Sequence, residues 1–259
     1  MDLLNLPIWQ EMKKITLEEM SDIKLMNRVD TKYMIHESML PELLSCVMNE
    51  YRVQVVAGLP VSKYSTLYYD TPELDMFITH HNGKKNRKKI RTRTYVESNL
   101  SFLEVKRKDN KGRTKKKRIK IPLMVFDNIF SSTEAEQFLK DLTPEYPLSR
   151  LIPHVSNRFD RITLVNIGKT ERLTIDGNIK FKNMQTGIEK SAPGFMIVEL
   201  KQDGQFPSVF KDILKERKVI AKGFSKYCLG VILTNPNAKY NRFKSKLRYI
   251  EKLTQNPKP

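Results

Sequence analysis

The chain has 259 residues, of which 47 are basic and 29 acidic, so its net charge is +18 and its pI is near 9.8. This length can bury a substantial core, and we expect one domain. The positive charge predicts an anionic partner, which composition leaves open as nucleic acid, a phosphate compound or an anionic membrane surface. No apolar stretch reaches the roughly 18 residues of a membrane span, and the N-terminus lacks the pattern of a signal peptide, so a cytoplasmic protein is expected.

Cysteines and histidines are few in this sequence. Cys46 and Cys228 each lie within an apolar helical pattern, which predicts two buried thiols in a reducing compartment. No spacing of cysteines and histidines is typical of a zinc site. His80 and His81 begin the segment HHNGKKN, which predicts a loop with exposed side chains.

In chain order, residues 1–27 are predicted to form a helical lead-in, because Thr16 and Glu19 fit a capping box. The segment RVDTKYMI follows, and its alternation of charged and less polar residues is typical of a strand. A helix is expected at 41–50 and a strand at 61–71.

Residues 87–120 carry much of the positive charge and predict three consecutive strands. Alternate side chains of a strand point to one face, so each of these strands gathers its cations on one side. The residues that share faces in this way are Arg87, Lys89, Arg91 and Arg93, then Phe102, Glu104, Lys106 and Lys108, and finally Thr114, Lys116, Arg118 and Lys120. Aligned cations on neighbouring strands repel each other, so a polyanion is expected against this surface.

The remaining chain alternates helices and strands. His154, Ser156, Arg158 and Asp160 share one face of a predicted strand, and Asp176, which precedes a glycine, is a candidate for metal binding or for stabilising a turn. The predicted elements are a helix capped by Ser132 or Thr133, strands at 151–166, 171–181 and 195–203, helices at 208–220 and 225–234, and a basic, partly helical end.

Seven or eight strands are therefore expected, and each has one apolar face and one face with ionic groups. Carboxylates are mixed among cations on nearly every charged face, which favours a closed antiparallel barrel with a polar lumen and helices outside. The alternative is an open sheet whose charged face is solvated.

Several fragments together resemble the VTC domain, the polyphosphate polymerase branch of the CYTH-like triphosphate tunnel metalloenzymes. They are RVDTKY, YSTLYYDT, KIRTRTY, FLEVKRK, GRTKKKR, SNRFDR, RLTIDGNIKF, IVELK and FSKYCLG. The resemblance implies a division into a lead-in at 1–27, a tunnel domain at 28–235 and a basic C-terminal helix and tail at 236–259. It also implies an α+β fold in which an eight-stranded antiparallel tunnel is surrounded by helices.

The resemblance further implies roles for individual residues. The cations that bind the triphosphate and support catalysis would be Lys32, Arg91, Arg93, Lys106, Lys116, Arg158 and Arg172. Arg118, Lys201 and Lys226 would bind substrate or polymer, and Glu199 would hold Mn²⁺ or Mg²⁺. A slip of one residue would exchange Lys117 for Lys116 and turn the strand over, so this register stays open.

The implied activity is transfer of the ATP γ-phosphate to a growing inorganic polyphosphate chain. Hydrolytic tunnel enzymes carry two glutamates on the first strand, where this chain has Arg28 and Asp30, so the polymerase branch is favoured. The alternatives are a tripolyphosphatase-type hydrolase of the same fold and a non-catalytic binder of polyphosphate or RNA. Sequence-specific nucleic-acid binding is not expected, because few aromatic residues accompany the cations. Dependence on a membrane-protein partner is left open.

Overall fold

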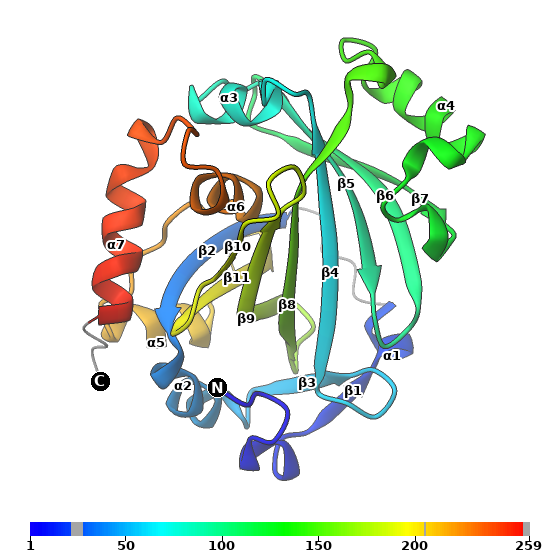
Figure 1. The fold of residues 1–259 in the computed structure, drawn as a ribbon. Coiled ribbons are helices and arrows are strands. Elements are labelled where there is room, and N and C mark those ends of the chain that lie inside the picture. The colour runs from blue at the N-terminus through cyan, green and yellow to red at the C-terminus, as the bar shows by residue number, and fades with distance from the viewer. Residues whose placement is uncertain (22–27, 205, 256–259) are drawn as a thin grey trace.

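The computed structural model describes residues 1–21, 28–204 and 206–255, and within them the strands form one large sheet (Figure 1). The strands are β1 (Lys14–Thr16), β2 (Arg28–His36), β3 (Tyr51–Val55), β4 (Val61–Asp70), β5 (Arg87–Tyr95), β6 (Leu100–Lys108), β7 (Thr114–Ile121), β8 (Ile152–Asn166), β9 (Glu171–Asn183), β10 (Glu189–Ser191) and β11 (Phe195–Asp203). The α-helices are α1 (Leu17–Ser21), α2 (Leu40–Val47), α3 (Asp75–His81), α4 (Thr133–Leu142), α5 (Val209–Glu216), α6 (Lys226–Thr234) and α7 (Lys244–Gln255).

The sheet is antiparallel along the order β2-β11-β9-β8-β4-β5-β6-β7. The short strands β1, β3 and β10 attach to it and bring the sheet to 11 strands within the described residues. The α+β class is as expected, but the predicted closure into an eight-stranded barrel is wrong. In the described part of the chain β2 and β7 do not pair, and both remain edge strands. The lysines of β7 are typical of an edge strand, because they disfavour the addition of another strand.

The N-terminal lead-in is only partly helical. The predicted capping box is present, since the Thr16 backbone N–H donates to Glu19 at 2.7 Å and the Glu19 N–H donates to the Thr16 hydroxyl at 3.2 Å. Before it, β1 pairs in parallel with β3. Residues 22–27 of the expected lead-in lie outside the described residues, and the division at 27 and 235 stays a prediction.

Two apolar clusters cover the convex face of the sheet. On one half, Tyr33, Leu173 and Val198 pack against α2, α5 and the N-terminal segment. On the other half, Ile90 and Leu103 pack against α4 and the segment before it. These clusters contain the apolar side chains that alternate with the cations, so they turn the charged side chains to the concave face.

Helix α6 covers the apolar part of the concave face. Its Tyr227 and Cys228 pack against Met34, Phe159 and Phe181 from three strands. The helix begins at the N-cap Ser225, whose hydroxyl accepts a hydrogen bond from the Cys228 N–H at 3.2 Å. The concave face is therefore divided between an apolar part under α6 and a charged part that stays accessible.

The two cysteines differ in environment. Cys228 is buried as predicted, whereas Cys46 is exposed, so the prediction of a second buried thiol is wrong. Helix α2 packs Leu43, Leu44 and Val47 onto the sheet, and Cys46 lies on the opposite side of the helix. None of the described helices has the length and apolar character needed to cross a membrane.

The close packing of α6 generates a first prediction. A Cβ atom at Gly230 would lie 2.6 Å from Val155 Cγ1 and 2.8 Å from Phe181 Cδ1, and both of these side chains are buried. Gly230→Ala is therefore expected to lower the free energy of unfolding by about 1–2 kcal/mol, because overpacking outweighs the better helix propensity of alanine. Urea denaturation would measure the change.

Gly223→Ala is the matched control. A Cβ atom at Gly223 would meet no atom within 4 Å, so this variant should stay within about 0.5 kcal/mol of the wild type. Equal stability of the Gly230 variant and the wild type would contradict the packing seen at α6.

Candidate functional site

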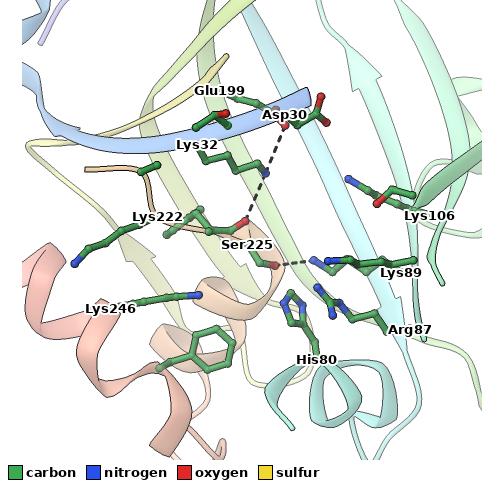
Figure 2. A pocket seen from close by; sticks show the side chains of 17 residues that line it. Asp30, Lys32, His80, Arg87, Lys89, Lys106, Glu199, Lys222, Ser225 and Lys246 are labelled. Carbon is green, nitrogen blue, oxygen red and sulfur yellow. Dashed lines mark hydrogen bonds and ion pairs between the residues drawn. The ribbon is translucent and has the colours of Figure 1, made fainter. Parts of the chain in front are cut away.

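A cavity of about 510 Å³ lies on the concave side of the sheet (Figure 2). Strands β2, β5, β6, β7 and β11 line it, together with α3, residues 221–225 and the start of the C-terminal helical segment. Its lining includes seven basic and two acidic side chains, so its potential is strongly positive. The basic residues are Lys32, Arg87, Lys89, Lys106, Lys108, Lys222 and Lys246, and the acidic residues are Asp30 and Glu199.

Strand alternation brings the cations of residues 87–120 together as predicted. Lys89 of β5 lies opposite Lys106 of β6, which lies opposite Lys116 of β7. The Lys106 side chain is exposed within the cavity. The surrounding protein nevertheless removes part of its hydration, and this desolvation, together with the positive charge of Lys32, lowers the pKa of Lys106 to about 8. These lysines are therefore crowded, and an anionic ligand would relieve their repulsion.

Glu104 of β6 links its strand to both neighbouring strands, through Arg91 of β5 and Lys116 of β7. Its side chain is 1% exposed, accepts from Arg91 Nε at 2.7 Å and lies 2.9 Å from Lys116 Nζ. Burial opposes its ionisation, but Arg91, Arg93 and Lys116 outweigh burial and lower the pKa of Glu104 to about 2. The contact also decides the register of β7, because Lys116 and not Lys117 faces the concave side.

Asp176 is a second buried carboxylate that pairs with two cations. Arg161 Nε and Nη2 donate to its two oxygens at 2.6 and 2.8 Å, and Lys226 Nζ donates as well. The pKa of Asp176 lies well below its usual range, because these two cations outweigh the effect of burial. Neither of the two predicted roles of Asp176 is needed to explain its position, since its oxygens hold Arg161 and Lys226 in place.

Aromatic rings lie beneath the same cations. Lys226 Nζ is 4.3 Å from the centre of the Phe159 ring, and the Arg161 guanidinium carbon is 4.7 Å from that of Tyr64. The Arg93 guanidinium carbon lies 5.6 Å from the Tyr64 ring. Cation–π attraction on these rings holds the basic groups at fixed positions on the concave face.

Glu199 lies in the cavity wall between lysines. Its carboxylate oxygens are 3.6 Å from Lys32 Nζ and 3.9 Å from Lys201 Nζ, and these charges overcome burial and lower its pKa to about 2. Asp30 pairs in register with Lys201 on the neighbouring strand, so Asp30 and Glu199 are diagonal neighbours that both line the cavity.

This arrangement fits a divalent metal that is held largely by a phosphate ligand. Within the described residues, no group of three or more histidine, cysteine or acidic side chains could hold a metal by itself. Mg²⁺ characteristically takes one or two carboxylates and fills its remaining positions with water and substrate phosphate oxygens. Glu199 and Asp30, which both line the cavity, supply such a pair of carboxylates.

The structure brings most of the predicted site residues to the concave face. Lys32, Lys106 and Glu199 line the cavity. The others that lie on this face, as their register shows, are Arg91, Arg93, Lys116, Arg118, Arg172, Lys201 and Lys226. Arg118 stacks on the Phe102 ring, with its guanidinium carbon 4.4 Å from the ring centre.

Arg158 is placed elsewhere. It is exposed, and it precedes Phe159, whose ring lies under the concave-face cations, so its side chain points to the opposite face. Arg161 occupies the concave position on β8 instead. Counting back from the β8–β9 turn pairs Arg161 with Asp176, and this hairpin count is the sequence signal that would have identified it.

His80 and Lys89 are functional candidates that the sequence did not single out. Lys89 Nζ donates to the Ser225 hydroxyl at 2.8 Å, which joins β5 to the start of α6 (Figure 2). His80 and His81 are the last two residues of α3 and do not lie in a loop. His80 lines the cavity and His81 is only 2% exposed, so the prediction of two exposed loop histidines is wrong. Burial and the charges of Lys89 and Arg87 lower the pKa of His80 to about 2, which keeps its imidazole neutral.

The VTC domain matches residues 27–235. The chain belongs to the VTC domain family. No curated protein matches it.

Two solved structures similar to this VTC domain protein are described as candidate adenylate cyclases. The protein from Bacillus halodurans is 15% identical over 84% of this chain and 99% of its own, with a TM-score of 0.49. The protein from Hippeastrum, whose structure is reported to reveal a dominant triphosphatase activity, is 13% identical over 78% of this chain and 94% of its own, with a TM-score of 0.50. At these identities the likeness concerns the fold alone.

The buried ion pairs predict a pH-dependent stability. Glu104→Gln should lower the free energy of unfolding by roughly 3 kcal/mol near neutral pH, because it leaves two cations without their anion. The pKa of Glu104 is depressed to about 2, so its contribution is complete above its ordinary pKa and is lost as the pH falls towards 2. Urea denaturation at pH 6 and pH 3 should therefore show a smaller difference between variant and wild type at the lower pH.

Glu145→Gln provides the control for this experiment. Glu145 pairs with Lys88 at 2.6 Å, but its side chain is 47% exposed, so its loss should cost less than about 1 kcal/mol. Equal losses in the two variants would contradict the special role of the buried carboxylate.

Proposed function

We propose that this protein is a polyphosphate polymerase that transfers the γ-phosphate of ATP to the end of an inorganic polyphosphate chain. The observation that supports this proposal most directly is the cavity, in which cations from β2, β5 and β6 converge. Among the described residues, the carboxylates that line it are Asp30 and Glu199. A linear phosphate chain is an extended polyanion, so it matches a cavity whose cations come from several strands.

The proposed reaction needs no nucleophile from the protein. A terminal oxygen of the polyphosphate chain attacks the γ-phosphorus, the bond from that phosphorus to the β–γ bridging oxygen breaks, and its electron pair leaves with ADP. Such a transfer passes through a loose transition state with charge on the equatorial oxygens. Catalysis then consists of alignment and charge neutralisation, which fixed cations can supply.

Arg91, Arg161 and Lys226, which we call the inner cations, are suited to this task because carboxylates already hold them in position. Glu104 orients Arg91, and Asp176 orients Arg161 and Lys226. A guanidinium can bind two phosphate oxygens at once, whereas an ammonium acts as a compact point charge. We assign Arg161 to the site in place of Arg158, because Arg161 is the arginine of β8 on the concave face.

Glu199, with Asp30 beside it, would hold Mn²⁺ or Mg²⁺. When bound, the metal would supply positive charge that neutralises phosphate oxygens. The low pKa of Glu199, about 2, keeps the carboxylate ionised and ready to bind a cation across the physiological pH range. Lys32 and Lys201 compensate its charge in the absence of a metal.

Membership in the VTC domain family supports polymerisation, as does the first strand, where Arg28 and Asp30 leave a smaller set of acidic residues than a pair of glutamates would. A hydrolase is the second candidate, because a structure of similar fold is reported to have triphosphatase activity. A binder of RNA is less consistent with the site, since the concave-face rings of Tyr64 and Phe159 are covered by cations and are unavailable for base stacking.

The central experiment compares two arginines of one strand. Purified protein is incubated with ATP and Mn²⁺, and long-chain polyphosphate, ADP and free phosphate are measured. Arg161→Ala should lower the rate of chain growth by about 100-fold, as is typical for the loss of a positioned donor in a transition state. Arg158→Ala, on the opposite face, should retain the wild-type rate.

The products separate the candidate functions. Chain growth supports the polymerase, free phosphate without chains supports the hydrolase, and binding without turnover contradicts both enzymes. Equal loss of activity in the Arg158 and Arg161 variants would contradict the assignment of the concave face as the site.

Glu199→Gln tests the metal site. This variant should lose metal-dependent turnover at every Mn²⁺ concentration, because one of the two carboxylates that bind the metal no longer carries charge. Its affinity for tripolyphosphate in the presence of a chelator should be retained, since the cations are untouched. Full turnover in this variant would contradict the assigned role of Glu199.

A further inference from the structure

One wall of the cavity comes from a part of the chain beyond the family match. The VTC domain match ends at residue 235, whereas Phe243 and Lys246 line the cavity. Helix α7 is anchored there by apolar contacts, since Leu247 and Ile250 pack with the cluster that includes Phe195 under α6. Figure 1 shows α7 alongside β2 and α6, so this helix is part of the site and not a detached tail.

Within the described residues, the cations at this end of the cavity, like Lys89 and Lys106, lack the carboxylate partners that the buried cations of the concave face have. Arg91, Arg161 and Lys226 each have a carboxylate partner. In the part of the chain that the structure describes, no carboxylate lies within 4.0 Å of the basic groups of Arg87, Lys108, Lys222 or Lys246. These outer cations therefore carry charge that the protein itself does not neutralise, which favours an anion from outside.

Aromatic contacts fix the positions of the two outer lysines, and in Figure 2 Lys222 points away from the centre of the cavity towards α7. Lys222 Nζ lies 3.6 Å from the centre of the Tyr249 ring, and Lys246 Nζ lies 5.4 Å from that of Phe243. The Lys222 backbone N–H also donates to the Lys32 carbonyl at 2.8 Å, which ties this segment to β2. In Figure 2, Lys246 reaches towards the space beside His80 and Arg87. The pKa of Lys246 is lowered by burial and by the charges of Arg87 and Lys222.

The side chains at this end of the cavity favour a phosphate ligand over a nucleobase. Phe224 and Phe243 are the aromatic residues that line this end of the cavity, and Phe243 ends the short 3-10 helix that precedes α7. The Phe224 ring lies 5.4 Å from that of Phe195, and the Phe243 ring stacks on Phe77 with centres 6.4 Å apart and planes at 14°. Lys246 also lies near the Phe243 ring. Each of the two rings thus packs on a neighbouring ring, whereas the cations around them have no carboxylate partner within the described residues, which favours a phosphate ligand over a base.

We propose that Arg87, Lys222 and Lys246 form an outer subsite that binds a linear polyphosphate chain beyond the phosphates held by the inner cations. The outer subsite rests on the proposed function for the identity of its ligand. It makes α7 a part of the chain-binding path, and it predicts that long chains gain affinity from contacts that a triphosphate does not reach.

The test measures binding and not turnover. The double variant Lys222→Ala/Lys246→Ala and the wild type are titrated with tripolyphosphate, with ATP and with long-chain polyphosphate at several salt concentrations. The affinity for the long chain should fall about tenfold, and the slope of log affinity against log salt should become shallower by roughly 1–2. The affinity for tripolyphosphate should change less than about twofold.

The double variant Arg248→Ala/Lys252→Ala is the matched control. Both residues lie on α7, are exposed and are absent from the cavity lining, and the control removes the same charge. It should bind the long chain like the wild type. Equal losses in the two double variants would overturn the proposal, because they would show an effect of overall charge.

Two further outcomes would also overturn the outer subsite. An equal loss of tripolyphosphate and long-chain binding would place the two lysines in the inner site or in the stability of the fold, which urea denaturation of the variant checks. A larger loss for ATP than for the long chain would assign them to the nucleoside. A protein that binds long chains through these lysines but does not extend them would refute the polymerase and leave the subsite in place.

Discussion

Repulsion between neighbouring cations is the constraint on which this structure depends. Adjacent strands carry lysine and arginine at facing positions, and a sheet with such rows is unstable without anions among them. Glu104, Asp176 and Glu199 meet this requirement from three strands, and each is buried or nearly so beside at least two basic side chains. The charge that they leave uncompensated lies in the cavity. The same balance that permits the sheet to fold thus leaves a positively charged cavity, which is the basis of the proposed function.

Helix α6 connects the packing of the domain to its chemistry. Its apolar side fills the part of the concave face that lacks charge, and close contact at Gly230 fixes its distance from β8 and β9. Its first residues then fall at the border of the charged part, where Ser225 meets Lys89 and Lys226 meets Asp176. A helix that is held by burial can place polar groups with little freedom, which is the condition for catalysis by alignment.

Sequence reasoning succeeded where the information was local. Period-two alternation assigned the faces of β5, β6 and β7, and the register of these strands confirms that Lys89, Lys106 and Lys116 lie together. On β8 alternation grouped residues by face but could not say which face points inward. The family resemblance pointed to Arg158, whereas Arg161 is the β8 arginine that lies on the concave face with Asp176.

The sequence by itself determined the strands, their alternation, the excess of basic residues and the membership in a family, because each is written in short-range patterns. Only the tertiary structure decided that the sheet stays open, that Glu104 binds Lys116 of β7, and that residues 221–225 and α7 wall the cavity. These contacts join segments far apart in the chain. Their distances follow from the twist of the sheet and the packing of helices on it, and no local periodicity contains that information.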